Sequence, residues 1–155
     1  MDQQLIADVN LAEGRRLTAY RDTRGFWTAG VGHKLPVGQD YTNIAYTPAQ
    51  SDSWLASDLD VAEAQAARLD EWSMLNTPCR CNALVECVFN LGLGHWIIEF
   101  PHTRAALKVQ DWNTAYTALL DSPEWISEVG FGRVNRLANY FLTGVYPLVN
   151  HGVKR

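Results

Sequence analysis

Residues 13–33 read EGRRLTAYRDTRGFWTAGVGH, and the pattern around this stretch decides how the chain begins to fold. Apolar residues at helical spacing precede it and predict a helix over residues 3–13, with Gly14 as its stop. Two β-prone runs, residues 17–20 and 26–32, are separated by a short polar segment whose Asp and Gly suit a hairpin turn. We therefore expect a short helix that leads directly into a β-hairpin.

A second helix start signal lies at Thr47. Threonine is a common N-cap residue, and Pro48 follows it at the first helical position, which proline favours. Apolar residues at helical spacing then predict a helix over about residues 48–68. The preceding residues 35–46 are turn-rich, with room for only one short strand. Further helical patterns cover residues 79–91, 103–109, 112–120, 123–127 and 134–142.

These patterns indicate the fold class α+β, predominantly α. A long amphipathic helix between a β-rich segment and a helical remainder suggests a bilobal protein with a cleft. We expect one domain over residues 1–155, with a small β-rich lobe over about residues 14–47 and an interlobe helix over about residues 48–68. The helical lobe is expected over about residues 74–150, together with the N-terminal helix 3–13.

The composition excludes several kinds of partner. The 155 residues include 13 Lys and Arg against 17 Asp and Glu, which gives a formal net charge of −4. This balance argues against general binding of nucleic acid or of anionic membranes. No apolar run approaches the ~18 residues that a membrane span requires, and no targeting segment begins the sequence. We therefore expect no membrane insertion and a cytoplasmic location after synthesis.

The negative charge is concentrated in the first half of the sequence. Residues 1–76 hold 6 basic and 11 acidic side chains, whereas residues 77–155 hold 7 basic and 6 acidic ones. Much of the excess lies on the predicted long helix. Five basic residues surround the predicted hairpin instead: Arg15, Arg16, Arg21, Arg24 and Lys34. We expect a locally positive site on an acidic body.

The three cysteines, Cys79, Cys81 and Cys87, lie within nine positions of one another. A disulfide framework needs more cysteines at wider separation, and a zinc site needs further ligands at defined spacing. We therefore expect buried or half-buried thiols, with no metal and no cofactor.

Glu13 and Asp22 stand apart from the other carboxylates, because a helix end and the adjoining hairpin turn can face one cleft. Glycoside hydrolysis needs one carboxyl group that delivers a proton and a second, ionised one that activates water or attacks the sugar. The apolar neighbours of Glu13 favour its protonated form, and the polar turn favours an ionised Asp22. Thr28, on the second strand, has a hydroxyl group that can hold a water. Spacing alone is weak evidence for catalysis, because two carboxylates nine positions apart are common, and it favours Glu13 as a helix-end surface residue and Asp22 as a turn-former.

The order of these residues resembles a known signature. Asp22 follows Glu13 after eight residues, Thr28 follows after five more, and the neighbouring Tyr, Trp-Thr and Gly-x-Gly-His positions agree as well. The stretch is similar to the catalytic signature of the phage T4-type lysozymes, glycoside hydrolase family 24. Residues 83–92 and 132–136 are similar to two later stretches of that family, so the resemblance covers most of the chain.

The resemblance implies a role for each matching residue. By this correspondence Glu13 is the general acid, Asp22 is the base that positions a water, and Thr28 assists. Arg133 matches a basic residue that approaches the catalytic Glu from the other lobe and orients it.

Other positions are expected to surround these residues. Lys34, Phe89 and Thr103 match family positions that line the saccharide groove. The family gives His33 no catalytic role, and we expect it to form a structural ion pair with Asp58 on the long helix.

The function implied by the resemblance is that of a muramidase, a lysozyme that cleaves the β-1,4 bond between N-acetylmuramic acid and N-acetylglucosamine in peptidoglycan. The expected setting is a phage endolysin for host cell lysis, a monomer that stays in the host cytoplasm until a holin releases it to the periplasm and cell wall. The alternatives are a non-catalytic lysozyme-fold module that binds glycan or a partner, a tail-associated lysozyme, and a secreted antibacterial toxin.

Some features depart from the family pattern. The segment from Lys34 to Thr47 is short, which suggests a trimmed small lobe with fewer sugar subsites. The groove position of Lys34 is more often apolar in the family. Familiar members are often basic, and this chain is not.

Overall fold

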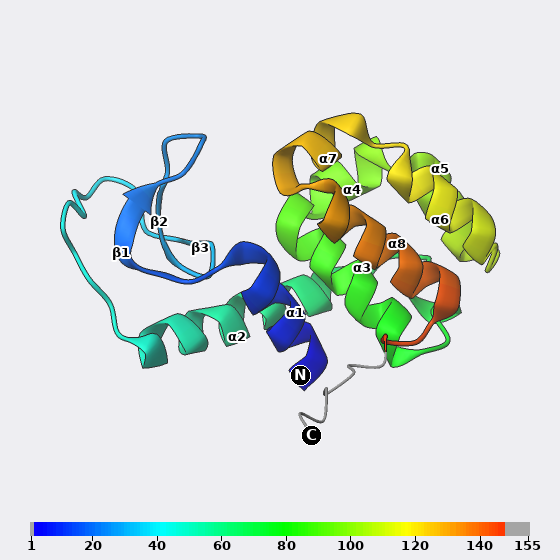
Figure 1. Cartoon of the computed structure of the whole chain (residues 1–155), viewed down its shortest axis with the longest axis horizontal. Helices are drawn as coiled ribbons and strands as arrows, with labels where there is room; N and C mark the ends of the chain where they lie inside the picture. The colour runs from blue at the N-terminus through cyan, green and yellow to red at the C-terminus, as the bar shows by residue number, and fades with distance from the viewer. Residues whose placement is uncertain (1, 148–155) are drawn as a thin grey trace, which may run out of the picture. The chain divides into compact units, whose positions relative to one another are not determined.

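A computed structural model describes residues 2–147 of the chain. The fold is α+β and mostly helical, with one small antiparallel sheet, which confirms the predicted fold class (Figure 1). The chain forms two compact units. The first unit ends at residue 68 and also takes in residues 85–93, and the second unit holds residues 69–84 and those from residue 94 onward. The predicted lobe boundaries stay a prediction.

The first unit begins with helix α1, Gln3–Glu13. The side chain of Asp2 caps its N-terminus by accepting a hydrogen bond from the N–H of Gln4, at 2.8 Å. The helix ends at Gly14, whose φ of +68° favours glycine. Both predicted ends of this helix are therefore confirmed.

Three strands follow α1: β1 (Arg16–Arg21), β2 (Trp27–Gly30) and β3 (His33–Lys34). They form one antiparallel sheet in the order β1-β2-β3 (Figure 1). The predicted hairpin is present. The third strand comes earlier than expected, because the chain reverses immediately after β2. Within residues 35–46 only an isolated bridge from Ala45 to Thr18 extends the sheet.

Gly30 and Gly32 make this early reversal possible. Their φ angles are +64° and +72°, a region that residues with a side chain rarely adopt. A Cβ atom at Gly30 would lie 2.9 Å from Oγ of Ser51, on the helix packed against β2. The glycine therefore lets the end of β2 approach that helix closely.

The helix beside the sheet is α2, Pro48–Ala66. Thr47 and Gln50 form a reciprocal capping box at its start, as the Thr47–Pro48 signal indicated. Apolar residues of the hairpin and the following loop form the core of this unit: Ala19, Ala29, Leu35 and Tyr41, with Trp27, Tyr46 and Trp54 packed against them. The predicted long helix is confirmed, and it supports one face of the sheet.

Helix α3, Pro78–Leu91, contributes residues to both units. The second unit further contains the short 3-10 turn η1 and five helices: η1 (Trp72–Met74), α4 (Leu93–Glu99), α5 (Pro101–Lys108), α6 (Trp112–Leu120), α7 (Pro123–Val129) and α8 (Phe131–Thr143). Helix α4 was missed from the sequence, where Gly92 and Gly94 indicated a break. Gly92, with a φ of +82°, does end α3, but a new helix starts at the next residue and tolerates Gly94 in its first turn.

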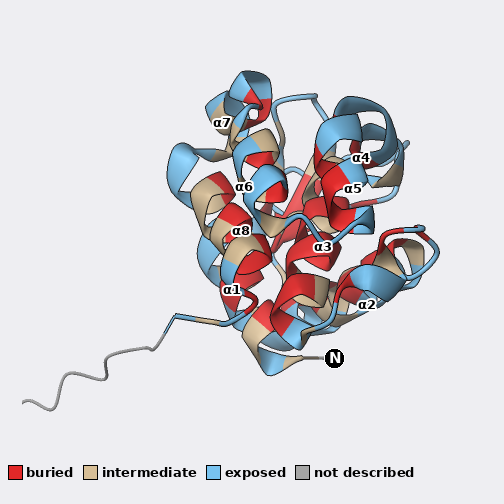
Figure 2. Cartoon of the chain, turned by 90° about the vertical axis from the view of Figure 1, so that its right-hand side faces the viewer, coloured by how far each residue is buried: buried red, intermediate tan, exposed pale blue. Residues whose placement is uncertain are grey.

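Large aromatic and aliphatic side chains fill the core of the second unit. Trp96 stacks on Phe100 with 5.2 Å between ring centroids, and Phe100 meets Trp125 edge-on. The buried residues of α8 recur at helical spacing along one side, and Figure 2 shows the same pattern on α5 and α8. The cysteines match the predicted burial, since Cys79 and Cys87 are buried and Cys81 is half-buried.

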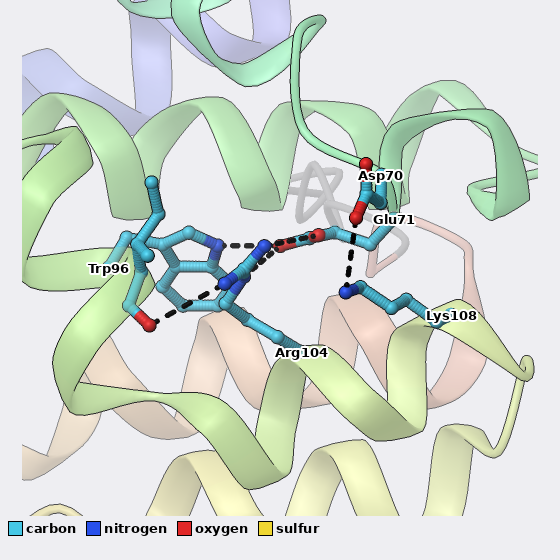
Figure 3. A network of polar contacts seen from close by, with 6 residues as sticks. Asp70, Glu71, Trp96, Arg104 and Lys108 are labelled. Atoms are coloured by element: carbon cyan, nitrogen blue, oxygen red, sulfur yellow. Dashed lines mark hydrogen bonds and ion pairs between the residues drawn. The ribbon is translucent and has the colours of Figure 1, made fainter.

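A buried ionic network organises the start of the second unit (Figure 3). The Glu71 carboxylate is fully buried, and accepts hydrogen bonds from Arg104 Nε at 2.7 Å and Trp96 Nε1 at 2.9 Å. Burial raises the pKa of the Glu71 carboxyl, but these hydrogen bonds and the Arg104 charge outweigh it and leave the pKa below its ordinary value. The network ties the segment before η1 to α4 and α5.

Over residues 2–147, no single helix is both long and apolar enough to cross a membrane. The bent pair α3 and α4 passes the same criterion of length and composition only when the two helices are taken together.

We predict that Gly30→Ala destabilises the protein more than Gly25→Ala. Both glycines have positive φ, +64° and +84°, so each alanine introduces backbone strain of about 1–2 kcal/mol. Only at Gly30 does the new Cβ meet other atoms, whereas the space around Gly25 is open within 4 Å. Urea unfolding should give a loss of about 1 kcal/mol for Gly25→Ala and about 3 kcal/mol for Gly30→Ala. Equal losses would contradict the close approach of β2 to α2.

Candidate active site

The register of the sheet places Asp22, Thr28 and Lys34 on one face of the hairpin. Thr28 lies opposite Tyr20 on β1 and opposite Lys34 on β3. Asp22 is two residues beyond Tyr20, and because side chains alternate along a strand, it belongs to the same face. The Lys34 ammonium group forms an ion pair with Oδ2 of Asp22. Sheet pairing therefore brings together three of the residues that the sequence singled out.

Asp22 is held from both of its carboxylate oxygens. Its Oδ1 accepts hydrogen bonds from the backbone N–H groups of Arg24, at 2.9 Å, and Phe26, at 2.8 Å, while Oδ2 contacts Lys34. Donors on both oxygens favour the ionised carboxylate and fix its orientation. The three donors thus give a structural basis for the orientation of the Asp22 carboxylate, and its ionised state stays a prediction.

Thr28 is almost completely buried, with 1% of its surface exposed. Its Oγ1 donates a hydrogen bond of 3.1 Å to the carbonyl oxygen of Phe26, which also accepts the N–H of Asp22. A hydroxyl group that donates one hydrogen bond can still accept another. The peptide groups of Phe26 therefore position both Asp22 and Thr28.

Glu13 is the last residue of α1 and is half-buried. Its Oε1 accepts a hydrogen bond of 3.2 Å from Nδ2 of Asn90 on α3, and a Cβ atom on Gly32 would lie 3.9 Å from Oε2. The carboxyl group therefore faces the turn between β2 and β3. The apolar surroundings inferred from sequence neighbours were wrong, because Leu11 is 86% exposed and points away from the core.

Asn90 was not singled out from the sequence. It lies within the Phe-Asn-x-Gly stretch near the end of α3, seventy-seven positions after Glu13 in the chain. That stretch was the one signal that could have identified it. Its amide supplies a polar contact to Glu13 that the sequence neighbours of Glu13 did not indicate.

Lys34 has an unusual environment for a largely exposed lysine. Burial lowers the pKa of its ammonium group, and the charge of Glu13 acts in the opposite direction. Its pairing with Asp22 also removes part of the positive charge expected around the hairpin. Arg15 is similarly paired, with Asp52 on α2. The locally positive site is therefore partly neutralised within the first unit.

His33 forms the ion pair expected from the sequence. Its Nδ1 lies 2.8 Å from Oδ2 of Asp58 on α2, and its ring stacks on Trp54 with 4.6 Å between centroids. The pair connects the start of β3 to α2. It lies on the opposite side of the sheet from Lys34, because consecutive side chains of a strand point to opposite faces.

The remaining predicted residues are not all in one unit. Phe89 is half-buried on α3 in the first unit, whereas Thr103 on α5 and Arg133 on α8 belong to the second. Their roles in the groove and in orienting Glu13 stay predictions. Thr103 is buried and lines a hollow of about 390 Å³ in the second unit. The hollow is lined by Glu99, Phe100, Pro101, His102, Thr103, Thr114, Thr117, Ala118 and Asp121.

No metal-binding cluster is apparent in the part of the chain that the structure describes. Nowhere in residues 2–147 do three or more His, Cys, Asp or Glu side chains come together in a way that could hold an ion.

The sequence of this chain matches the family model described as "Phage lysozyme" over residues 10–139. The match includes the hairpin face, Glu13 and Asn90. The chain belongs to the phage lysozyme family. The fold expected from the resemblance, an α+β lysozyme-like fold, agrees with the elements of both units.

Two phage proteins are similar to this member of the phage lysozyme family. "Pre-baseplate central spike protein Gp5" of Enterobacteria phage T4 is 28% identical over an alignment that covers 92% of this chain and 28% of that protein. "Peptidoglycan hydrolase gp36" of Pseudomonas phage phiKMV is 30% identical, with 84% of this chain and 15% of that protein covered. The chain therefore spans less than a third of the length of either relative.

We predict that Asp58→Asn lowers the free energy of unfolding by about 1–2 kcal/mol at neutral pH. The substitution removes a partly buried, charge-assisted hydrogen bond to His33. Asp60→Asn is the matched control, because Asp60 lies exposed on the same helix and should change stability by less than about 0.5 kcal/mol. Urea unfolding of both variants measures the difference, and an Asp58→Asn variant as stable as the control would contradict a stabilising pair.

Proposed function

We propose that this chain is a peptidoglycan hydrolase, and specifically a muramidase that cleaves the β-1,4 bond between N-acetylmuramic acid and N-acetylglucosamine. The observation that supports it best is the arrangement in the first unit. Asp22 and Thr28 share a hairpin face, and the Glu13 carboxyl group faces the turn that ends this hairpin. Membership of the phage lysozyme family and the similarity to a protein named as a peptidoglycan hydrolase support the same reaction.

In the proposed mechanism Asp22 activates the attacking water. The carboxylate is oriented by its three donors, and because Oδ1 already accepts two of them, Oδ2 is the oxygen that has a lone pair left to accept a hydrogen bond from water. Thr28 assists by accepting a hydrogen bond from the same water. An inverting glycosidase leaves room for this water between its carboxylate and the sugar.

Glu13 acts as the general acid and delivers its proton to the leaving oxygen of the sugar. The amide of Asn90 donates to Oε1, and a neutral amide donor can bind a carboxyl group in both its protonated and its ionised form. The orientation of Glu13 is therefore kept through the transfer of its proton.

We infer a phage endolysin as the first biological setting, held in the host cytoplasm until a holin releases it toward the periplasm and cell wall, and acting as a monomer. A tail-associated lysozyme is the second candidate. It is supported by the similarity to a protein named as a central spike protein, which is several times longer than this chain. A secreted antibacterial toxin would use the same chemistry.

A non-catalytic binding module is supported less well. Such a module would have no need for Glu13, Asp22 and Thr28 together, and here the turn and the sheet fix two of them on one face. Binding of glycan without release of new reducing ends would favour it.

We predict that Glu13→Gln lowers the rate of peptidoglycan cleavage by a factor of roughly 10² to 10⁴, because the amide cannot donate the required proton. Glu63→Gln is the matched control, since Glu63 is exposed on α2 outside the proposed site. Release of reducing ends from purified peptidoglycan measures both variants. A Glu13→Gln variant as active as the Glu63→Gln control would overturn the proposed mechanism.

A further inference from the structure

We propose that Lys34 is a positioning residue for the proposed reaction: its ammonium group holds the Asp22 carboxylate beside Thr28 and keeps it in the ionised form that activates water. This inference rests on the proposed muramidase function and adds a residue to it. The family resemblance implies instead that Lys34 lines the saccharide groove.

The first argument is the position of Lys34 in the sheet. Lys34 pairs directly with Thr28 across β2 and β3, and Asp22 lies diagonally beyond Thr28 on the same face. A lysine side chain is long enough to cross one strand to a diagonal neighbour. The register therefore places the ammonium group at Asp22.

The second argument is the division of donors at Asp22. Oδ1 is already occupied by two backbone N–H groups of the turn, and Lys34 supplies the charged donor at Oδ2. The Asp22 side chain is 16% exposed, whereas that of Lys34 is 57% exposed. The more exposed Lys34 thus pairs with a mostly buried carboxylate. The attraction between the two charges is therefore less screened by solvent than in a fully exposed ion pair.

The third argument is that Lys34 is held by more than one neighbour. Its Nζ lies 5.7 Å from the centre of the Phe26 ring, and it also interacts with the charge of Glu13. The ammonium group therefore contacts the proposed base directly and interacts with the proposed acid through its charge.

Other charged groups of the first unit engage different partners. In the hairpin, Arg21 donates to the carbonyl oxygen of Gly25 at 2.8 Å, and Arg24 contributes its backbone N–H to Asp22. The other ion pairs among the described residues of this unit are His33 with Asp58 and Arg15 with Asp52, both of which reach α2. Among the ion pairs of the described residues, Lys34 is the cation that contacts Asp22.

The test is the titration of the Asp22 carboxyl group, followed by carbon-13 NMR in protein labelled at aspartate and assigned by comparison with Asp22→Asn. We expect Lys34→Met to raise the titration midpoint of Asp22 by roughly 0.5–1 pH unit, because an ion pair favours the ionised form. Lys34→Arg should restore most of the shift. Lys34→Gln repeats the test with a polar side chain if the Met variant does not fold.

Arg15→Met is the matched control. It removes the same amount of positive charge from the same unit, but its partner is Asp52 rather than Asp22. Screening by salt should keep its effect on the Asp22 midpoint below about 0.2 pH unit. An unchanged midpoint in Lys34→Met, or an equal shift in Arg15→Met, would overturn the inference.

The pH dependence of cleavage gives the catalytic side of the same test. In Lys34→Met the acid limb of the profile for kcat should move to higher pH with the Asp22 midpoint. A change in KM at an unmoved acid limb would instead assign Lys34 to substrate contact and overturn its positioning role. An inactive wild-type protein would contradict the proposed function, while the NMR midpoint would still decide whether Lys34 keeps Asp22 ionised.

Discussion

The proposed site depends on the hydrogen bonds that close the turn between β1 and β2. The N–H of Asp22 donates to the carbonyl oxygen of Phe26 at 2.9 Å, and the N–H of Phe26 donates back to the Asp22 side chain at 2.8 Å. The same carbonyl oxygen accepts the hydroxyl group of Thr28. One peptide segment therefore closes the hairpin and orients two of the three proposed catalytic side chains.

The rest of the first unit keeps this hairpin in place. The positive φ of Gly30 and Gly32 turns the chain back as β3, which carries Lys34 and His33 to opposite faces of the sheet. His33 then pairs with Asp58 on α2 and stacks on Trp54, while Lys34 pairs with Asp22. A short strand of two residues thus links the supporting helix on one side with the proposed chemistry on the other.

Local signals made part of this structure predictable. The Asp and Gly between two β-prone runs indicated the hairpin, Gly14 marked the end of α1, and Thr47 with Pro48 marked the start of α2. The pairing of His33 with Asp58 was also anticipated. For the hairpin and the two helix ends the physical cause lies in neighbouring residues, which the sequence displays directly, whereas the His33–Asp58 pair joins residues 25 positions apart.

Other features depend on contacts between distant segments, and the sequence did not reveal them. Asn90 reaches Glu13 from α3, and the apolar environment inferred for Glu13 from Leu11 was wrong because helix geometry turns Leu11 outward. The buried Glu71 network joins segments that are more than twenty positions apart.

In the sequence, both Gly92 and Gly94 indicated a break between helices, and this prediction was wrong for Gly94. Gly92 ends α3 through its own φ, yet Gly94 is accommodated inside α4, so two glycines separated by a single residue have opposite structural roles.

The candidate catalytic residues were found through a signature rather than through geometry. Two carboxylates nine positions apart are common, and only the agreement of the surrounding Tyr, Trp-Thr and Gly-x-Gly-His positions made them distinctive. The structure adds a physical reason for that spacing. Asp22 must occupy the turn, and Thr28 must follow on β2 at the position that shares its face, whereas Glu13 must end the preceding helix.

The most direct test of this account is the chemical identity of the ends that the protein creates in peptidoglycan. Purified peptidoglycan would be digested, the products reduced with borohydride, and the new termini identified by mass spectrometry. The account predicts reduced N-acetylmuramic acid at the new ends. Reduced N-acetylglucosamine, or stem peptides released without new reducing ends, would contradict it.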